Sequence, residues 1–332
     1  MRDHNLLGPW VRRFLLEHIV AERNLSRNTQ ISYRDTLALL LPFIARKVAK
    51  GVDRLVVDDV SSDRVRAFLD HVECERKCSV ATRNHRLAAI HSLARFVGTS
   101  APEHVAWCSQ VRSVPFKKAT RAVIGYLEKD ELDALLRVPD RCTVLGARDY
   151  ALLLFLYNSG ARADEAASLR VCNLQLGTSP SVRILGKGNK WRICPLWPKT
   201  VDTLRPLVAA QGPDDHVFRG RTGEPMTRFG VHRVVTSSAA IAAEKVGTMR
   251  CKRISPHNLR HTTAVHLLRA GVDINTIRAW LGHVSLDTTH IYAEVDLEMK
   301  AKALASVDIG DLAGTLSRRH SVPSIMEFMQ RL

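Results

Sequence analysis

The sequence of 332 residues contains no long hydrophobic run. Its most apolar stretches, such as residues 151–157, are far shorter than the roughly 20 residues that a helix needs to span a bilayer. The N-terminus, MRDHNLLGPW, lacks the sustained apolar segment of a secretory signal peptide. We therefore expect a protein with no membrane partner and a cytoplasmic location.

Close cysteine pairs are also scarce. The seven cysteines are scattered along the chain, and their one close pair, Cys74 and Cys78, lies in a segment with helical periodicity. This pattern is typical of reduced thiols rather than of a disulfide framework. A zinc site needs about four ligands in tight pairs, and the sequence offers no carboxylate cluster for Mg²⁺. We predict no metal site and no cofactor.

Basic side chains, in contrast, are abundant. Lys and Arg total 49 against 33 Asp and Glu, which gives a formal net charge of +16 and an isoelectric point near 9.9. The excess is +9 over residues 1–122 and +7 over residues 123–332. Such a charge favours nucleic acid as the partner, because phosphate neutralisation releases counterions. The plainer alternative is a generally basic protein without such a partner.

The first hundred residues have the periodicity of a small helical bundle, which we assign to a domain over residues 1–105. Helices are expected after Ser26, over residues 62–72 and over residues 80–96. Periodicity lapses near residue 98, and a basic run follows Pro115, so we predict a linker over residues 106–122. The basic residues expected either to follow a DNA backbone or simply to face solvent are Arg76, Lys77, Arg83, Arg86, Lys117 and Lys118.

The second half, a predicted domain over residues 123–310, is mostly helical with one β-hairpin. Helices are expected over residues 129–138 and 146–158, the latter ending at Gly160. In residues 181–196 the period changes to that of strands. Val182 and Ile184 alternate with polar neighbours, a turn follows at Gly186–Asn189, and the apolar residues Trp191, Ile193 and Leu196 continue beyond it. The fold class is therefore mainly α with a small β-sheet.

Three later helices have clear boundaries. Ser255 and Pro256 begin the first, which ends at Gly271, and Asp273 begins the second, which ends at Gly282. A third begins at Ser285 or Asp287 and includes Tyr292.

Polar residues gather at these helix ends and at the hairpin turn. They are Arg162 and Glu165, Lys187 in the turn, His257 and Arg260 three residues apart, His283 after Gly282, and Tyr292. Each motif taken singly has an ordinary explanation, such as a surface helix or a local Arg–Glu pair.

Taken in order, these motifs resemble the tyrosine recombinase (phage integrase) family. The stretches SGARADEAASLR, ILGKGNKWRICPL, SPHNLRHTTAVHLLRAGVDINTIRAWLGH and SLDTTHIYAEV look like the family's four landmark motifs in their usual order. LSRNTQISYRDTLALLLPF looks like the start of the family's core-binding domain. The resemblance implies an N-terminal helical, SAM-like core-binding bundle followed by an α+β catalytic domain.

The resemblance also implies the roles of the residues. Tyr292 is the nucleophile that forms a 3′-phosphotyrosyl link, and Arg162 and Arg260 hold the phosphate. Guanidinium groups suit this task because their paired donors stabilise the extra negative charge of phosphodiester transfer. Lys187, with Lys190 as the alternative in the same turn, donates a proton to the leaving oxygen. Of the others, His257 acts as acid or base, His283 donates to the phosphate, and Glu165 orients a site residue.

The partners implied are double-stranded DNA and further copies of the chain, a homodimer on each site and a homotetramer in synapsis. Residues 311–332 form a tail that we expect to dock on the same or a neighbouring subunit. We predict a site-specific DNA recombinase, which needs no ATP, encoded by a mobile element such as a phage or transposon. The alternatives are a type IB topoisomerase and a DNA-binding regulator that does not cleave.

Overall fold

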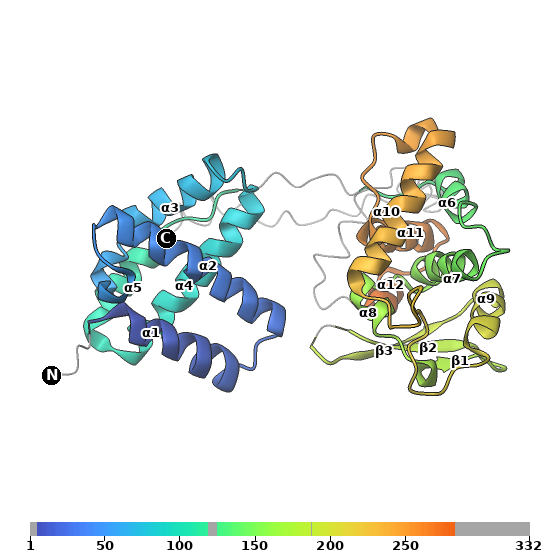
Figure 1. Ribbon diagram of the computed structural model, residues 1–332, viewed down its shortest axis with the longest axis horizontal. Helices are drawn as coiled ribbons and strands as arrows, with labels where there is room; N and C mark the ends of the chain where they lie inside the picture. Colours follow the sequence, from blue (N-terminus) through green and yellow to red (C-terminus); the bar gives the residue numbers. More distant parts are fainter. Residues whose placement is uncertain (1–4, 119–124, 187, 283–332) are drawn as a thin grey trace, which may run out of the picture. The chain divides into compact units, whose positions relative to one another are not determined.

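The computed structural model describes residues 5–118, 125–186 and 188–282. Lys187, His283, Tyr292 and the predicted tail lie outside these ranges. The chain divides into two compact units, residues 1–123 and 124–332. Figure 1 shows the helices and strands of the described part of each unit. No helix in the described ranges has the length and apolar character needed to cross a lipid bilayer.

The first unit is a helical bundle, as the sequence predicts. Its core is apolar and includes Phe14, Leu40, Phe68 and Leu93. The three long helices each begin after a serine whose hydroxyl accepts a hydrogen bond from a backbone N–H three residues later, which satisfies a donor that the helix leaves free. The helices are α1 (Leu7–Arg13), the π-helical η1 (Phe14–Glu22), α2 (Arg27–Lys47), the 3₁₀ turns η2 (Val52–Arg54) and η3 (Val57–Asp59), α3 (Ser62–Cys74), α4 (Val80–Ser100), the 3₁₀ turn η4 (Pro102–His104) and α5 (Val105–Arg112).

Helix α5 corrects the predicted linker over residues 106–122. The indole of Trp107 is buried and donates a hydrogen bond to the carbonyl oxygen of Val60 at 2.9 Å. Val111 and Val114 are buried in the same core. The apolar face of this helix is only two turns long, which is why the periodicity of the sequence did not identify it. The first unit therefore continues past residue 105.

The second unit packs helices on one side of a three-stranded sheet (Figure 1). The predicted helix ends are confirmed, since Gly160 and Gly282 end helices with the positive φ values, 58° and 66°, that suit glycine. Its elements are α6 (Lys129–Leu136), α7 (Val144–Ser159), α8 (Ala163–Ala167), the 3₁₀ turn η5 (Val171–Asn173), β1 (Leu174–Gln175), β2 (Ser181–Leu185), β3 (Trp191–Pro195), α9 (Pro198–Val208), α10 (Arg228–Lys245), the 3₁₀ turn η6 (Gly247–Met249), α11 (Pro256–Arg269) and α12 (Ile274–Leu281).

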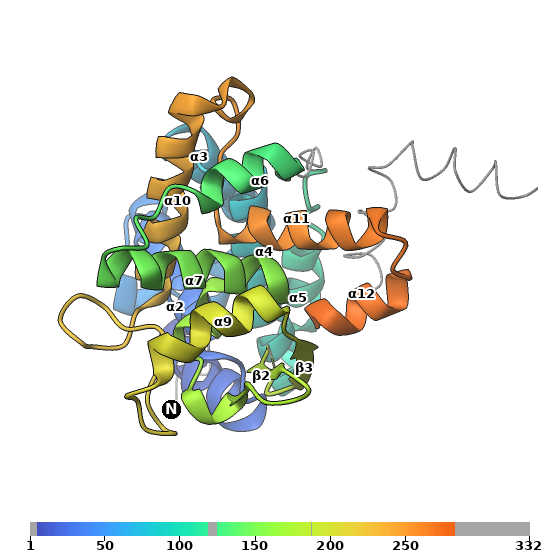
Figure 2. The ribbon, with the colours of Figure 1, turned by 90° about the vertical axis from the view of Figure 1, so that its right-hand side faces the viewer.

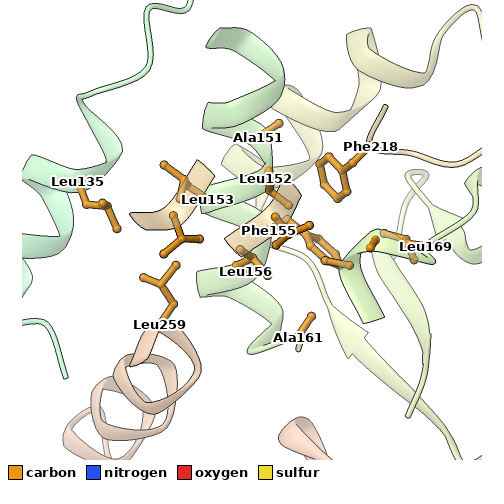
Figure 3. Close-up of a cluster of buried hydrophobic side chains, with 14 of the residues drawn as sticks. Leu135, Ala151, Leu152, Leu153, Phe155, Leu156, Ala161, Leu169, Phe218 and Leu259 are labelled. Atoms are coloured by element: carbon orange, nitrogen blue, oxygen red, sulfur yellow. The ribbon is translucent and has the colours of Figure 1, made fainter. Parts of the chain in front are cut away.

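Helix α7 is the centre of this unit. It contacts α6, α9, α10 and α11, and Figure 2 shows it crossing the unit between α9 and α11. Because it is covered on several sides, its residues from Ala151 to Leu156 are all buried, and the core around them includes Leu259 of α11 and Phe218 (Figure 3). This packing holds the end of α7, at Gly160, in a fixed position.

The hairpin forms as predicted, but the residues of β3 that face the core are not its large apolar ones. Strand β2 pairs antiparallel with both β1 and β3, with Leu185 opposite Trp191. Along β3 the exposed side chains are Trp191 and Ile193, and the buried ones are Arg192 and Cys194. The apolar Trp191 and Ile193 therefore face away from the core of this unit. Arg192 occupies a core position because it has a buried charged partner.

Candidate active site

The predicted site residues lie where several chain ends meet. Arg162 follows the end of α7 and is the N-cap of α8, and Arg260 lies on the first half of α11. A Cβ added at Gly160 would lie 2.3 Å from Leu281 Cδ2 and 3.8 Å from Arg260 Cγ. The end of α7 therefore lies against both α11 and the end of α12.

Arg260 is the largest fully buried side chain among the described residues, with 1% of its surface exposed. Its Nη1 donates to the carbonyl oxygen of Gly160 at 2.6 Å, and its Nη2 donates to that of Leu281 at 2.5 Å. Both acceptors are carbonyls at helix ends, which have no partner within their own helices. The guanidinium thus joins the ends of α7 and α12.

Glu165 lies between two arginines. Its Oε1 accepts from Arg162 Nη1 at 2.7 Å, and its Oε2 accepts from Arg192 Nη2 at 2.7 Å and from the backbone N–H of Arg162 at 2.9 Å. Burial alone would raise the pKa of Glu165, but the hydrogen bonds and charges of Arg192 and Arg162 outweigh it and hold the pKa below its usual value. The carboxylate is therefore ionised at neutral pH. The local Arg162–Glu165 pair is present, but Glu165 is buried instead of lying on an exposed helix.

Arg192 belongs to this site and is not among the residues that the sequence predicts. Its side chain is 7% exposed, and its Nε donates to the carbonyl oxygen of Trp280 at 3.0 Å. An arginine inside an otherwise apolar strand pattern is the signal that could have identified it, since charged residues are rarely buried without a partner.

The imidazoles of His257 and His261 lie together on α11, with ring centroids 4.2 Å apart. Partial burial, followed by the positive charges of Arg260 and Arg162, lowers the pKa of His257. Burial, followed by His257 and Arg260, lowers the pKa of His261 to about 4. The influence of Arg162 and Arg260 on His257 places these three predicted residues in one cluster, and both imidazoles are neutral at pH 7.

Two predicted residues adjoin this cluster in the sequence but lie outside the described residues. A Cβ placed on Gly186, which precedes Lys187, would lie 3.5 Å from Glu165 Oε1. A Cβ placed on Gly282, which precedes His283, would lie 3.1 Å from Arg192 Cδ. Lys190, the alternative to Lys187, is described and exposed. The positions of Lys187, His283 and Tyr292 themselves stay predictions.

The DNA-contacting residues predicted in the first unit do not share one environment. Arg76, Lys77 and Lys118 are exposed, and Arg86 is half-buried. Arg83 is only 5% exposed, so the prediction that it lies on an open polar face is wrong. Lys117 Nζ forms an ion pair with Glu73 at 2.7 Å.

Arg83 is buried because residues that follow α5 pack against it. Its Nε lies 3.6 Å from Glu73, and its Nη1 donates to the carbonyl oxygen of Pro115 at 3.4 Å. The neighbouring Asn84 donates to the carbonyl oxygen of Lys117 at 2.8 Å and accepts from its backbone N–H at 3.1 Å. These contacts fix the chain as it leaves the first unit, a structural role that the sequence alone did not predict.

The chemistry of the cluster follows from its charges. The guanidiniums of Arg162 and Arg192 bind the carboxylate of Glu165, and that of Arg260 binds the carbonyl oxygens of Gly160 and Leu281, so the group carries an excess of positive charge. Only Arg162 among them is substantially exposed, with 38% of its side chain accessible. A preformed set of cationic donors of this kind suits an anionic group that gains charge during reaction, such as a phosphodiester.

Comparisons with known proteins agree with this chemistry. The pattern of the phage integrase family matches residues 125–299, and that of the N-terminal SAM-like domain of phage integrases matches residues 12–98. The Sinorhizobium fredii protein y4rC, to which integrase/recombinase activity is ascribed, is 37% identical over 334 residues and covers 100% of both chains. The tyrosine recombinase XerC of Pelobacter propionicus is 32% identical over 298 residues, 87% of this chain and 91% of the relative.

Solved structures share the fold. The XerH site-specific recombinase bound to palindromic difH substrate has a TM-score of 0.64 at 20% identity, over 86% of this chain and 81% of that chain. The Tn1549 transposon integrase in complex with a circular intermediate DNA has a TM-score of 0.65 at 16% identity, over 89% and 98%. From its sequence pattern and its relatives, the chain belongs to the phage integrase family, the family of the tyrosine recombinases.

Proposed function

We propose that this protein is a site-specific DNA recombinase that cleaves and rejoins strands through a 3′-phosphotyrosyl intermediate on Tyr292. The observation that carries the proposal is the cluster in which the charges of Arg162 and Arg260 act on the imidazole of His257, while Arg162 is bonded to the buried, ionised Glu165. The cluster contains the cationic donors that phosphoryl transfer requires, and family membership supplies the nucleophile expected beside them.

The proposed reaction conserves the number of phosphodiester bonds. The phenolic oxygen of Tyr292 attacks the scissile phosphorus, and the bond from phosphorus to the 5′-oxygen breaks. Lys187, or Lys190 in the same turn, gives a proton to the leaving 5′-oxygen. A 5′-hydroxyl of another strand then attacks the phosphotyrosine and releases Tyr292. Because the covalent intermediate stores the bond energy, the cycle needs no ATP.

We assign the supporting roles from the charges of the cluster. Arg162, which is partly exposed, presents donors to the non-bridging oxygens, and Arg260 adds positive charge from the buried side. The lowered pKa of His257 keeps its imidazole neutral at pH 7 and therefore able to accept the proton of the nucleophile. His283 is assigned as a further donor to the phosphate, and no metal is part of this scheme.

The proposed partner is double-stranded DNA, bound by a homodimer at each site and by a homotetramer in synapsis. The charge of +16 supports a polyanionic partner. Among the structural neighbours, lambda integrase has been solved as a dimer on a core site and as a tetramer on a Holliday junction. We assign the first DNA contacts to the exposed Arg76, Lys77 and Lys118 and to the half-buried Arg86.

We also propose that a mobile element encodes the protein, since a transposon integrase is among the proteins that share its fold. Mapping covalent protein–DNA adducts across the DNA that flanks the gene tests this origin. Adducts at two ends that bracket the gene are expected, whereas adducts only at a distant chromosomal site would contradict it.

A nicked suicide substrate tests the activity. Cleavage near the nick releases a short fragment, so religation fails and the covalent adduct accumulates. Wild-type protein should form the adduct, Tyr292→Phe should form none, and Tyr126→Phe, which removes a phenol hydroxyl bonded to Arg269, should form it normally. An adduct undiminished in Tyr292→Phe would overturn the assignment. Joining of two separate duplexes, rather than relaxation of supercoils alone, distinguishes recombination from topoisomerase action.

A further inference from the structure

Arg192 is a buried cation that the proposed reaction does not use directly. Its side chain is 7% exposed and points inward from β3. Burying a guanidinium is costly unless hydrogen bonds and an opposite charge compensate it. Here Glu165 supplies the charge, and the carbonyl oxygen of Trp280 supplies a second acceptor. The side chain therefore connects the strand to two other elements.

The first connection leads to Arg162. Glu165 uses one carboxylate oxygen for the Arg162 guanidinium and the other for Arg192 and the Arg162 backbone N–H. With both oxygens occupied, the carboxylate is held in one orientation. That orientation in turn restricts Arg162, which is 38% exposed and would otherwise have the freedom of a long surface side chain.

The second connection leads to the end of α12. The last two carbonyls of this helix are both held by buried guanidiniums, that of Trp280 by Arg192 and that of Leu281 by Arg260. The alkyl part of Arg192 also lies beside Gly282, the residue that ends the helix with positive φ. Position 283 follows directly in the sequence, so these contacts fix the point from which the chain continues.

We propose that Arg192 is a positioning residue. It orients Arg162 through Glu165 and anchors the end of α12 through Trp280, so that the groups assigned to the phosphate are held in place before DNA arrives. Groups of this kind gain much of their effect from supporting hydrogen bonds that lock their geometry. This inference rests on the proposed function, because it assigns Arg192 to the same site.

Arg192→Lys tests the proposal, because lysine keeps the charge but cannot donate in two fixed directions. The adduct rate constant on a saturating suicide substrate should fall by about 10- to 100-fold, the range that lost supporting contacts usually give. Affinity for uncleaved DNA should stay within about threefold of wild type, because the contacts that stabilise the bound DNA and the transition state equally are unchanged. Arg183→Lys, on the exposed face of the adjacent strand β2, is the matched control and should keep the wild-type rate constant.

Loss of folding and loss of positioning have different signatures in this assay. Partial unfolding reduces the fraction of active enzyme and therefore the amplitude of adduct formation, whereas mispositioning reduces the rate constant. If Arg192→Lys does not fold, the double variant Arg192→Met/Glu165→Gln is assayed in its place, because it removes both buried charges together. An unchanged rate constant in a folded variant overturns the proposal.

A double-mutant cycle tests the route through Glu165. If Arg192 acts through this carboxylate, Glu165→Gln combined with Arg192→Lys should lose about as much rate as the more damaging single change. Losses that multiply instead would mean that the two residues act independently, which contradicts the route.

Hydrogen exchange tests the anchor without any need for cleavage. Amides of residues 274–281 should exchange faster by about tenfold or more in Arg192→Lys but not in Arg183→Lys, because the end of α12 loses an anchor. Unchanged exchange rejects the anchor. If wild-type protein forms no adduct at all, the proposed function fails, and exchange still decides whether Arg192 holds the helix.

Discussion

Arg260 shows how one side chain can be both structural and functional. The residue is proposed to stabilise the phosphate, yet its Nη1 and Nη2 each donate to a carbonyl oxygen at a helix end. A guanidinium has five N–H donors, so these bonds need not exhaust its capacity. The two bonds hold the guanidinium in place before a ligand binds.

We expect Arg260→Met to destabilise the second unit by about 2–5 kcal/mol, because the buried carbonyls of Gly160 and Leu281 lose their donors. Urea unfolding followed by tryptophan fluorescence measures the change. Arg253→Met, an exposed position, controls for the loss of charge. Equal stability of Arg260→Met and wild type would contradict the two buried hydrogen bonds.

His261 makes the stability of the second unit depend on pH. Its pKa is about 4 in the folded protein and near 6.5 in the unfolded chain, so the unfolded state binds the proton first as pH falls. The contribution of this residue to stability is complete above pH 6.5 and is lost between pH 6.5 and pH 4, and it amounts to on the order of 3 kcal/mol.

His261→Gln should therefore flatten the pH dependence of unfolding between pH 6.5 and pH 4. Chemical denaturation at a series of pH values measures it, and His85→Gln, on the exposed side of α4, controls for the loss of an imidazole. A wild-type slope retained in His261→Gln would show that other groups cause the dependence.

At the level of single residues, the sequence predicted the site residues whose motifs span only a few neighbouring positions. Arg162, Glu165, His257 and Arg260 stand in short motifs, and the structure brings them together. Arg192 was missed because its partner Glu165 is 27 residues away, a distance at which no periodicity operates.

At the level of elements, the boundaries of helices were the most predictable feature. A serine or aspartate cap and a terminal glycine act through hydrogen bonds and φ values within a few residues, so Ser26, Asp273 and Gly282 were assigned correctly. The buried face of β3 could not be predicted from the sequence, because apolar side chains occur on both faces of the strand and only the fold decides which face packs.

Two glycines separate the cost of backbone conformation from the cost of packing. Gly271 has φ 82° with no described atom within 4 Å of an added Cβ, so Gly271→Ala should cost about 1 kcal/mol. Gly160 has φ 58° and would bring a Cβ within 2.3 Å of Leu281, so Gly160→Ala should cost about 2–4 kcal/mol.

Urea unfolding of both variants measures these costs. The larger loss for Gly160→Ala is expected because the ends of α7 and α12 must then separate, which should also slow adduct formation. Equal losses in the two variants would contradict the close packing of these helix ends.

For the whole molecule, the fold class was predictable from periodicity, but the extent of the first unit was not. Helix α5 and the contacts of Arg83 with the chain after it depend on residues far apart in the sequence. The net charge is a property of the whole chain and leads to a prediction of its own.

DNA binding should depend steeply on salt. If the protein contacts roughly six to ten phosphates, its affinity should fall by about 10³- to 10⁵-fold between 50 and 200 mM salt. Titration by fluorescence anisotropy at several salt concentrations measures the slope. Lys118→Ala should reduce the slope by the amount expected for about one phosphate contact. Lys117→Ala should reduce it by less, because Lys117 is paired with Glu73. A slope near zero would contradict a DNA backbone as the ligand.

The attachment point of the trapped DNA tests the central claim most directly. Digestion of the adduct and mass spectrometry of its nucleotide-bearing peptide identify one of the five tyrosines of the chain. We predict a 3′-phosphate ester on Tyr292. Attachment to Tyr126 or Tyr157, a 5′-phosphate ester, or a nucleotide on serine instead of tyrosine would contradict the account.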